Sequence, residues 1–172
     1  MISHKYKCIF IHIPRTGGTS LETHICGKDW WKINSGTKHL IASTAKKVYK
    51  EHWDDYFKFS FVRNPWARMA SMVKYAHSYG VCINNGKLDV SGYLTSEFVR
   101  DGREVDPRTV SADDEFPPAT PNCVYGNILN EELDFVGRLE NIEQDSKFIL
   151  KTIGFPELKT YPKVESRHIK RT

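Results

Sequence analysis

An apolar run near the amino terminus, followed at once by a glycine-containing turn, constrains the fold more than any other feature of this sequence. Residues 8–13 read CIFIHI, in which His12 is the single polar side chain. A run that does not alternate is typical of a strand covered on both faces, as in a parallel sheet. The sequence PRTGG at residues 14–18 ends the run, and Thr19 and Glu22 match a capping box at the start of a helix. We therefore expect a central strand, a polar turn and a helix, in that order.

A second strand and helix are expected further along the chain. Residues 57–62 read FKFSFV and alternate in the manner of a strand. Asn64 and Pro65 follow, and these are favoured residues for the N-cap and the first position of a helix. The buried stripe of that helix is expected to comprise Trp66, Met69, Met72, Val73 and Ala76.

Weaker patterns extend this α/β arrangement. They predict a helix over residues 42–52, a strand over 133–139, and a helix from a cap at Asn141 to Gly154. The sequence thus predicts a three-layer α/β domain with a central, mostly parallel sheet of few strands.

Two remaining regions carry no strong pattern of strands or helices. Residues 80–127 are rich in Gly, Pro, Asp and Asn, and we expect loops there over one face, with one short helix near 93–100. Residues 163–172 form a basic tail.

Length and composition bound the class of protein. A chain of 172 residues corresponds to one domain at roughly 150 residues per domain, and 40% apolar residues suffice for a core. Neither a membrane span nor a signal peptide is visible, so a cytoplasmic location is expected. Four cysteines without CxxC spacing argue against a zinc site and favour free thiols. The formal charge of +4 suits an anionic ligand and is too small for a domain that binds duplex nucleic acid.

The first turn has the features of an anion site. Ligands of open parallel sheets bind beyond the carboxyl ends of the strands. Residues 14–20 (PRTGGTS) offer backbone N–H groups, two glycines, a cation, hydroxyls and a helix N-terminus. The pattern G-x-x-x-x-G-K-[ST] is absent, so this is not a Walker A loop. The alternative is a tight turn whose glycines serve packing alone.

The second turn places two guanidinium groups near one hydroxyl. Arg63 lies at the strand end, and Asn64, Arg68 and Ser71 are separated by four and three residues, which places them on one helical stripe. Arginine pairs well with oxyanions, so this turn is a candidate phosphate site. The alternative is a solvated polar face with ordinary surface arginines.

Three segments, in this order, resemble the sulfotransferases of the carbohydrate-acting, membrane-type group (sulfotransferase family 2). Residues 11–21 (IHIPRTGGTSL) resemble the phosphosulfate loop, 61–71 (FVRNPWARMAS) the loop for the 3′-phosphate of the donor, and 134–141 (DFVGRLEN) a later strand-to-helix segment. The resemblance implies a P-loop NTPase-like α/β fold without a metal. It also implies sulfuryl transfer from 3′-phosphoadenosine 5′-phosphosulfate (PAPS) to a hydroxyl or amine of a carbohydrate-like acceptor.

The resemblance also implies which residues contact the donor. Those implied for the 5′-phosphosulfate are Arg15, Thr16, Gly17, Gly18, Thr19 and Ser20, and those for the 3′-phosphate are Arg63 and Ser71. Arg15 stands where the family usually has lysine, which preserves the charge but argues against proton donation. Relatives generally continue past a basic segment like residues 166–171, so we expect a minimal or a truncated member of the family.

His39 is the candidate general base. The sequence around Lys38 and His39 resembles a histidine position of the family, and imidazole titrates near neutral pH. We expect the Lys38 charge to help keep His39 neutral by lowering its pKa. The alternative is that His39 caps or packs the following helix. His12 is expected to be a core histidine, and Arg138 with Glu140 a structural ion pair.

Two further hypotheses stand beside a PAPS-dependent sulfotransferase. One is a non-catalytic nucleotide- or oxyanion-binding domain that kept both loops and lost turnover. The other, a nucleotide kinase, is disfavoured by the missing Walker lysine. Trp30, Trp31 and Trp66 could stack on a sugar or on adenine, with core packing as the alternative. Neither the acceptor nor the oligomeric state can be deduced from these patterns.

Overall fold

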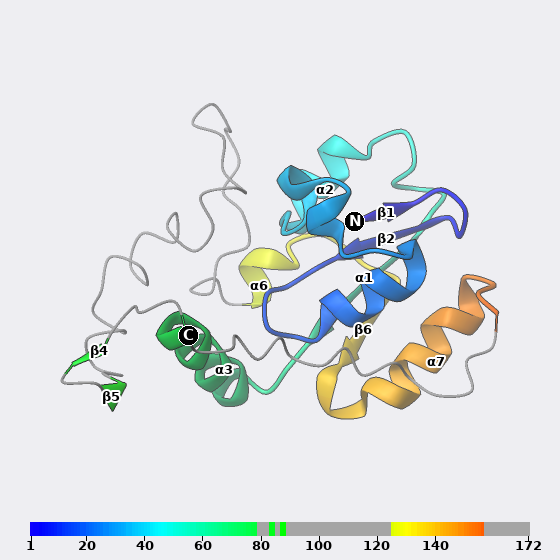
Figure 1. Ribbon diagram of the computed structural model, residues 1–172. Coiled ribbons are helices and arrows are strands. Elements are labelled where there is room, and N and C mark those ends of the chain that lie inside the picture. Colours follow the sequence, from blue (N-terminus) through cyan, green and yellow to red (C-terminus); the bar gives the residue numbers. More distant parts are fainter. Residues whose placement is uncertain (79–82, 85–86, 89–124, 157–172) are drawn as a thin grey trace.

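A four-stranded sheet lies at the centre of the computed structural model, which describes residues 1–78, 83–84, 87–88 and 125–156 (Figure 1). The strand order is β1-β2-β3-β6. The three parallel strands are β2 (Cys8–Ile11), β3 (Phe57–Val62) and β6 (Phe135–Arg138), and β1 (Ile2–Ser3) runs antiparallel to β2. The predicted mixed α/β class with a mostly parallel sheet is confirmed. Because the parallel strands point the same way, their carboxyl ends share one edge of the sheet.

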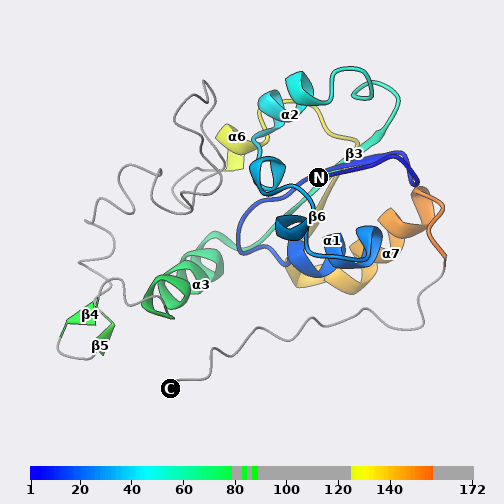
Figure 2. The ribbon, with the colours of Figure 1, turned by 45° about the horizontal axis from the view of Figure 1, so that its top comes forward.

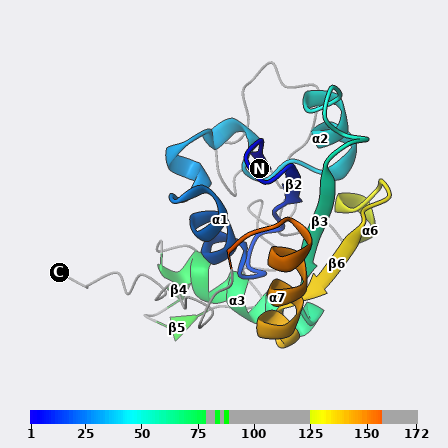
Figure 3. The same cartoon turned by 90° about the vertical axis from the view of Figure 1, so that its right-hand side faces the viewer.

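Helices cover both faces of this sheet (Figure 3). One face carries α1 (Gly18–Cys26) and α7 (Ile142–Thr152), and the other carries α2 (Ala42–Val48) and α6 (Tyr125–Ile128). All four side chains of β2 are buried, and they alternate between the two apolar clusters. This two-sided burial explains why the sequence of β2 is a continuous apolar run.

The two clusters meet the sheet through different side chains. The cluster under α1 and α7 includes Cys8, Phe10, Phe59, Phe61, Leu21 and Ile149. The cluster under α2 and α6 includes Ile9, Ile11, Ala42, Ala45, Tyr49 and Ile128.

Helix α3 (Pro65–Ser78) extends beyond the sheet at the end where β2 and β3 terminate (Figure 2). The predicted stripe is confirmed at Met72 and Val73, which are buried, but it is wrong at Trp66, which is 84% exposed. The first turn of α3 projects past the carboxyl edge of the sheet, so none of the other described elements covers Trp66.

Other expectations differ from the structure in detail. The helix predicted over 42–52 ends at Val48, although Trp53 is buried beyond it. β1 was not predicted, because two residues give no periodic signal. Short 3-10 helices lie at Trp30–Lys32, Ser35–Thr37 and Leu139–Asn141. Inside the predicted loop region, β4 (Ile83–Asn84) pairs with β5 (Lys87–Leu88).

Some of the predictions fall outside the described residues. These are the helix near 93–100, the tail at 163–172, most of the loop region, and two of the four cysteines. Cys8 and Cys26 are free thiols, and burial raises their pKa to about 12 and about 11.

Candidate functional site

The turn between β2 and α1 contains two residues with left-handed backbone. Arg15 has φ +66° and Gly17 has φ +84°, with Thr16 fully buried between them. The Thr16 hydroxyl donates to the carbonyl of Ile13 at 2.8 Å. Gly17 is the N-cap of α1, and no side chain of the described residues caps this helix. The first N–H groups of α1 are therefore available to an anion.

The predicted capping box of Thr19 and Glu22 is wrong. α1 begins one residue before Thr19, and Glu22 is fully buried in the second turn of the helix. Its carboxylate accepts from His12 Nδ1 at 2.7 Å and from Lys38 Nζ at 2.6 Å. The Glu22 carboxylate, which the local pattern assigned to a helix cap, is thus bonded to the Lys38 ammonium and the His12 imidazole, both outside the helix.

Packing explains the glycines that follow Arg15. A Cβ on Gly18 would lie 2.4 Å from His12 Cδ2, and a Cβ on Gly17 would lie 2.7 Å from Leu139 Cδ1. These close approaches support the packing interpretation of the two glycines. They also bring the first turn of α1 down onto β2 and beside the turn after β6, at the carboxyl edge of the sheet.

The turn between β3 and α3 is closed by its own polar groups. Asn64 Oδ1 accepts from the backbone N–H groups of Trp66 and Ala67 at 3.0 and 3.2 Å, which confirms the predicted cap. Glu140 Oε1 accepts from the Asn64 N–H at 2.8 Å, and this bond is the main cause of the lowered pKa of Glu140. Glu140 thus supports the second turn, and no ion pair with Arg138 is found in the described part of the chain.

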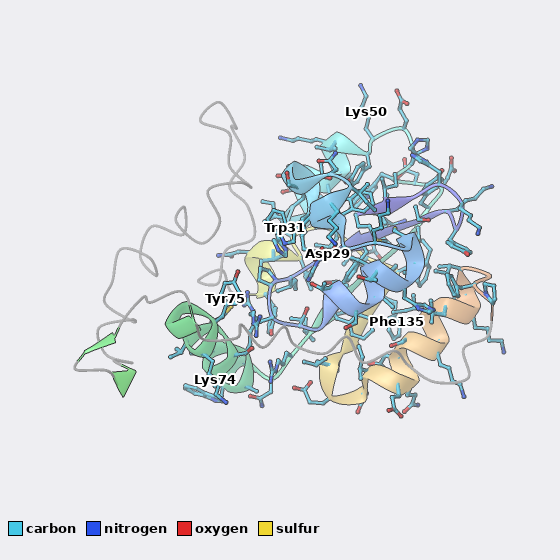
Figure 4. The ribbon with its side chains drawn as sticks, viewed as in Figure 1. Asp29, Trp31, Lys50, Lys74, Tyr75 and Phe135 are labelled. Atoms are coloured by element: carbon cyan, nitrogen blue, oxygen red, sulfur yellow. The ribbon has the colours of Figure 1, made fainter. Side chains whose placement is uncertain are left out.

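The two turns meet at Arg15. Its Nε donates to Ser71 Oγ on α3 at 2.9 Å, and Arg63 Nη1 donates to the Arg15 carbonyl at 3.4 Å. The Arg15 guanidinium also lies 5.1 Å from the ring centroid of Tyr75. Figure 4 shows Tyr75 and Lys74 pointing in different directions from α3, with Tyr75 toward the β2–α1 turn. The structure therefore brings together three of the predicted donor-binding residues from two separate motifs.

Arg68 and Tyr125 hydrogen bond to the backbone of these turns. Arg68 is 6% exposed, and its Nε donates to the Pro14 carbonyl at 3.1 Å. The hydroxyl of Tyr125 donates to the Arg63 carbonyl at 2.6 Å and accepts from the Arg63 N–H at 3.0 Å. Arg68 thus connects the turns, whereas the sequence analysis considered it as one group of a candidate phosphate site or of a solvated polar face. No sequence pattern pointed to Tyr125, which lies at the end of the loop-rich region.

His39 is tied to the first turn through the backbone of His12. Its Nδ1 donates to the His12 carbonyl at 2.9 Å, and its ring contacts those of His12 and Trp31 at centroid distances of 4.6 and 5.5 Å. Burial is the main cause that lowers the pKa of His39 well below 6.5. Lys38 lowers it further, as expected, but is a smaller cause. A neutral imidazole whose proton is on Nδ1 keeps a lone pair on Nε2.

The other predicted donor ligands and aromatic residues have mixed environments. Thr19 and Ser20 are partly exposed on the first turn of α1. His12 is 3% exposed and is a core histidine, as predicted. Trp30 is also buried, and its Nε1 donates to Thr37 Oγ1 at 2.9 Å, which confirms the core alternative for that tryptophan.

The described ranges lack a metal-binding cluster and a membrane-spanning helix. Within residues 1–78 and 125–156 and the two short strands, no group of His, Cys, Asp or Glu is arranged to hold a metal ion. None of the helices described is both long and apolar enough to cross a membrane.

Comparison with known proteins identifies the family. The chain belongs to the sulfotransferase family, whose model matches residues 1–172. It is 29% identical to carbohydrate sulfotransferase 14 of Danio rerio over 94% of the chain, and 23% identical to human carbohydrate sulfotransferase 9 over 97%. The alignments cover only 50% and 43% of those two proteins. An uncharacterized protein of Archaeoglobus fulgidus is 29% identical over 64% of this chain and 78% of its own length. No solved structure matches the chain.

Proposed function

We propose that this chain is a PAPS-dependent sulfotransferase built as one P-loop NTPase-like domain over residues 1–172. The observation that carries the proposal is the meeting of the two turns at Arg15, which contacts Ser71 by its side chain and Arg63 by its carbonyl. Two cations and a hydroxyl lie beside an uncapped helix N-terminus at the carboxyl edge of a parallel sheet. This arrangement suits a ligand with two anionic groups, as PAPS has.

The donor's two anionic ends would bind at different turns. The 5′-phosphosulfate would contact the first N–H groups of α1, the Arg15 guanidinium, and the hydroxyls of Thr19 and Ser20. Thr16 would contribute its backbone N–H, because its hydroxyl already donates to Ile13. The 3′-phosphate would contact Arg63 and Ser71.

Transfer requires that negative charge be stabilised and a proton be removed. The acceptor oxygen or nitrogen attacks sulfur, the bond from sulfur to the 5′-phosphate oxygen breaks, and the adenosine bisphosphate leaves. Arg15 and the N-terminus of α1 would stabilise charge on the leaving oxygen. His39 Nε2 would accept the proton of the acceptor. Burial supports this role because it keeps His39 neutral at pH 7.

A carbohydrate-like acceptor is proposed from the relatives. Two of them are carbohydrate sulfotransferases, and this chain aligns with each over nearly its whole length. The chain spans about half the length of these relatives, so the acceptor class has to be tested directly.

One observation favours a second candidate, a non-catalytic nucleotide-binding domain. Arg15 replaces the usual lysine of the family loop, and its side chain is engaged with Ser71 and Tyr75. Such a domain would bind the nucleotide and transfer nothing.

A thermal-shift experiment followed by a transfer assay separates these candidates. In the presence of EDTA, adenosine 3′,5′-bisphosphate should raise the Tm more than AMP or ATP does. Equal stabilisation by magnesium-ATP, or no stabilisation by the bisphosphate, would overturn the donor assignment. Radiolabelled PAPS is then incubated with a panel of desulfated polysaccharides and simple glycosides. Transfer to any of them supports the enzyme, and binding without transfer supports the second candidate.

A further inference from the structure

The segment that carries His39 is anchored by a buried charge. From Trp31 to Ile41, Lys38 is the only buried side chain, at 1% exposed. The rest of this segment is partly or fully exposed, with Leu40 and Ile41 packed at the margin of the cluster under α2 and α6 on the carboxyl-terminal side of His39. What fixes Lys38 therefore also fixes its neighbour His39.

Two carboxylates clamp the Lys38 ammonium. Its Nζ lies 2.6 Å from Glu22 Oε2 on α1 and 2.5 Å from Asp29 Oδ1 in the following loop. Asp29 also caps the next 3-10 helix by accepting from the Trp31 N–H at 3.1 Å, and Figure 4 labels this pair. Lys38 thus joins its segment to α1 and to the loop between Asp29 and Trp31.

The same network returns to His39 through the core of the protein. Glu22 Oε1 accepts from His12 Nδ1 at 2.7 Å, and the carbonyl of His12 accepts from His39 Nδ1 at 2.9 Å. Burial opposes the ionisation of Glu22, but His12 and Lys38 together hold its pKa at about 2. Neighbouring residues 38 and 39 are therefore both restrained, one by a side chain of α1 and the other by a carbonyl just after β2.

We propose that Lys38 is a positioning residue, whose clamp between Glu22 and Asp29 holds the His39 imidazole in its Nδ1–H form beside the β2–α1 turn. This inference rests on the proposed function, in which His39 Nε2 is the base. Burying an ion pair usually gains little stability over apolar side chains of similar size. An apolar anchor would bury the segment as well but would not fix its direction, because apolar contacts are not directional. Two short hydrogen bonds from Lys38 to carboxylates do fix the direction of the segment. Proton transfer requires the base to be held in a fixed position in this way.

The test uses a double variant, Lys38→Met with Glu22→Gln. Lys38→Met alone would leave Glu22 charged, buried and without its cation, and that protein could fail to fold. The double variant removes both charges and keeps similar volumes, and the amide that replaces the Glu22 carboxylate can still hydrogen bond to His12. Lys46→Met is the matched control, because it breaks the exposed pair of Lys46 and Glu131 at 2.7 Å, which has no residue in common with this network.

Three measurements are made on the full chain. Nitrogen NMR of the His39 ring reports its tautomer, calorimetry reports the affinity for adenosine 3′,5′-bisphosphate, and the transfer assay reports kcat and KM. In the double variant we expect a mixture of tautomers, unchanged bisphosphate affinity, and a kcat lowered about tenfold or more. Lys46→Met should match the wild type in all three. Lys38→Arg keeps a cation between the carboxylates and should recover part of both the tautomer preference and kcat.

The outcomes separate this inference from the proposed function. A folded double variant with wild-type kcat and an unchanged His39 tautomer would overturn the clamp. So would a lowered kcat with an unchanged tautomer, since Lys38 would then act by another route. If His39→Ala keeps normal turnover, the assignment of the base fails, while the tautomer measurement still decides whether Lys38 positions His39.

Discussion

The two strand-to-helix turns at the carboxyl edge occupy equivalent places in the sheet, yet they begin their helices in opposite ways. α1 begins after two left-handed residues and has no side-chain cap within the part of the chain that the structure describes. α3 begins at Pro65, with the Asn64 side chain on its first N–H groups and Glu140 on the N–H of Asn64. A helix N-terminus can offer its N–H groups to an anion only where its own side chains leave them unbonded.

From this difference we expect the two turns to have different roles in ligand binding. The first turn can hold a ligand by its backbone and can stabilise charge that develops during transfer. The second turn has used its backbone N–H groups internally, so it can contribute only the side chains of Arg63 and Ser71. Substitutions in the first turn should therefore change turnover, and those in the second should change affinity or stability.

The largest effect is expected at His39, the proposed base, which hydrogen bonds to the His12 carbonyl before the first turn. His39→Ala should lower kcat about 10² to 10⁴-fold and leave the affinity for adenosine 3′,5′-bisphosphate unchanged. Since burial places the His39 pKa well below 6.5, wild-type kcat should be constant from pH 7 to 6.5 and fall only at lower pH, where the imidazole becomes protonated. Steady-state kinetics over pH 4.5–8 check both points. Near-normal turnover of a folded His39→Ala protein would move the role to Glu140, which is exposed at the second turn.

The next largest effect is expected at Arg15. Arg15→Ala removes the cation of the first turn and should lower turnover by about 10²-fold or more, because preorganised charge acts mainly on the transition state. Single-turnover rates with saturating donor measure this directly. A normal rate would assign charge stabilisation to the N-terminus of α1 alone. It would then contradict the expectation that side chains of the first turn act on turnover and those of the second on affinity.

A smaller effect is expected from the second turn. Arg63→Ala should weaken bisphosphate binding by roughly 1.5–3 kcal/mol, which is about 10- to 150-fold in Kd, with a smaller loss for Ser71→Ala. Lys50→Ala is the control, since Lys50 is exposed and lies away from α3 (Figure 4). Calorimetric titration that finds unchanged affinity in Arg63→Ala would contradict the assignment of the 3′-phosphate site.

The smallest effect is expected at the cap of α3. Asn64→Ala should lower the free energy of unfolding by about 1 kcal/mol, because two backbone N–H groups lose their acceptor. The neighbouring control, Trp66→Ala, removes an 84% exposed side chain and should stay within about 0.5 kcal/mol. Chemical denaturation of both variants compares them. Equal stabilities would show that the cap of α3 is dispensable.

Local patterns predicted the elements that carry the site. The apolar run of β2, the alternation of β3 and the Asn64-Pro65 start of α3 are each a direct expression of burial or capping. Arg15 was expected at the 5′-phosphosulfate and Arg63 with Ser71 at the 3′-phosphate, from the resemblance of two motifs, and the structure has these three residues in contact. That they bind the donor stays a prediction. The predictions of the elements succeed because each rests on neighbours in the sequence.

The misses arise where distant residues override a local pattern. Glu22 matches a capping box, but His12 and Lys38 bind it in the core. Nothing in the local sequence distinguishes Lys38 from a surface lysine, and only the fold brings two carboxylates to its ammonium. Tyr125 belongs to a region without a pattern, yet it holds both backbone groups of Arg63.

The backbone of Arg15 has a consequence for how this position evolves. An L-residue at φ +66° is disfavoured by roughly 1–2 kcal/mol, and glycine escapes that penalty. Selection for stability alone therefore favours glycine or asparagine at position 15, whereas selection for the proposed sulfuryl transfer would favour a cation. A library randomised at this position should diverge accordingly, with thermostability screens enriching small residues and activity screens retaining arginine or lysine. The most strained residue of the first turn is thus the place where folding and turnover compete for the identity of a single amino acid.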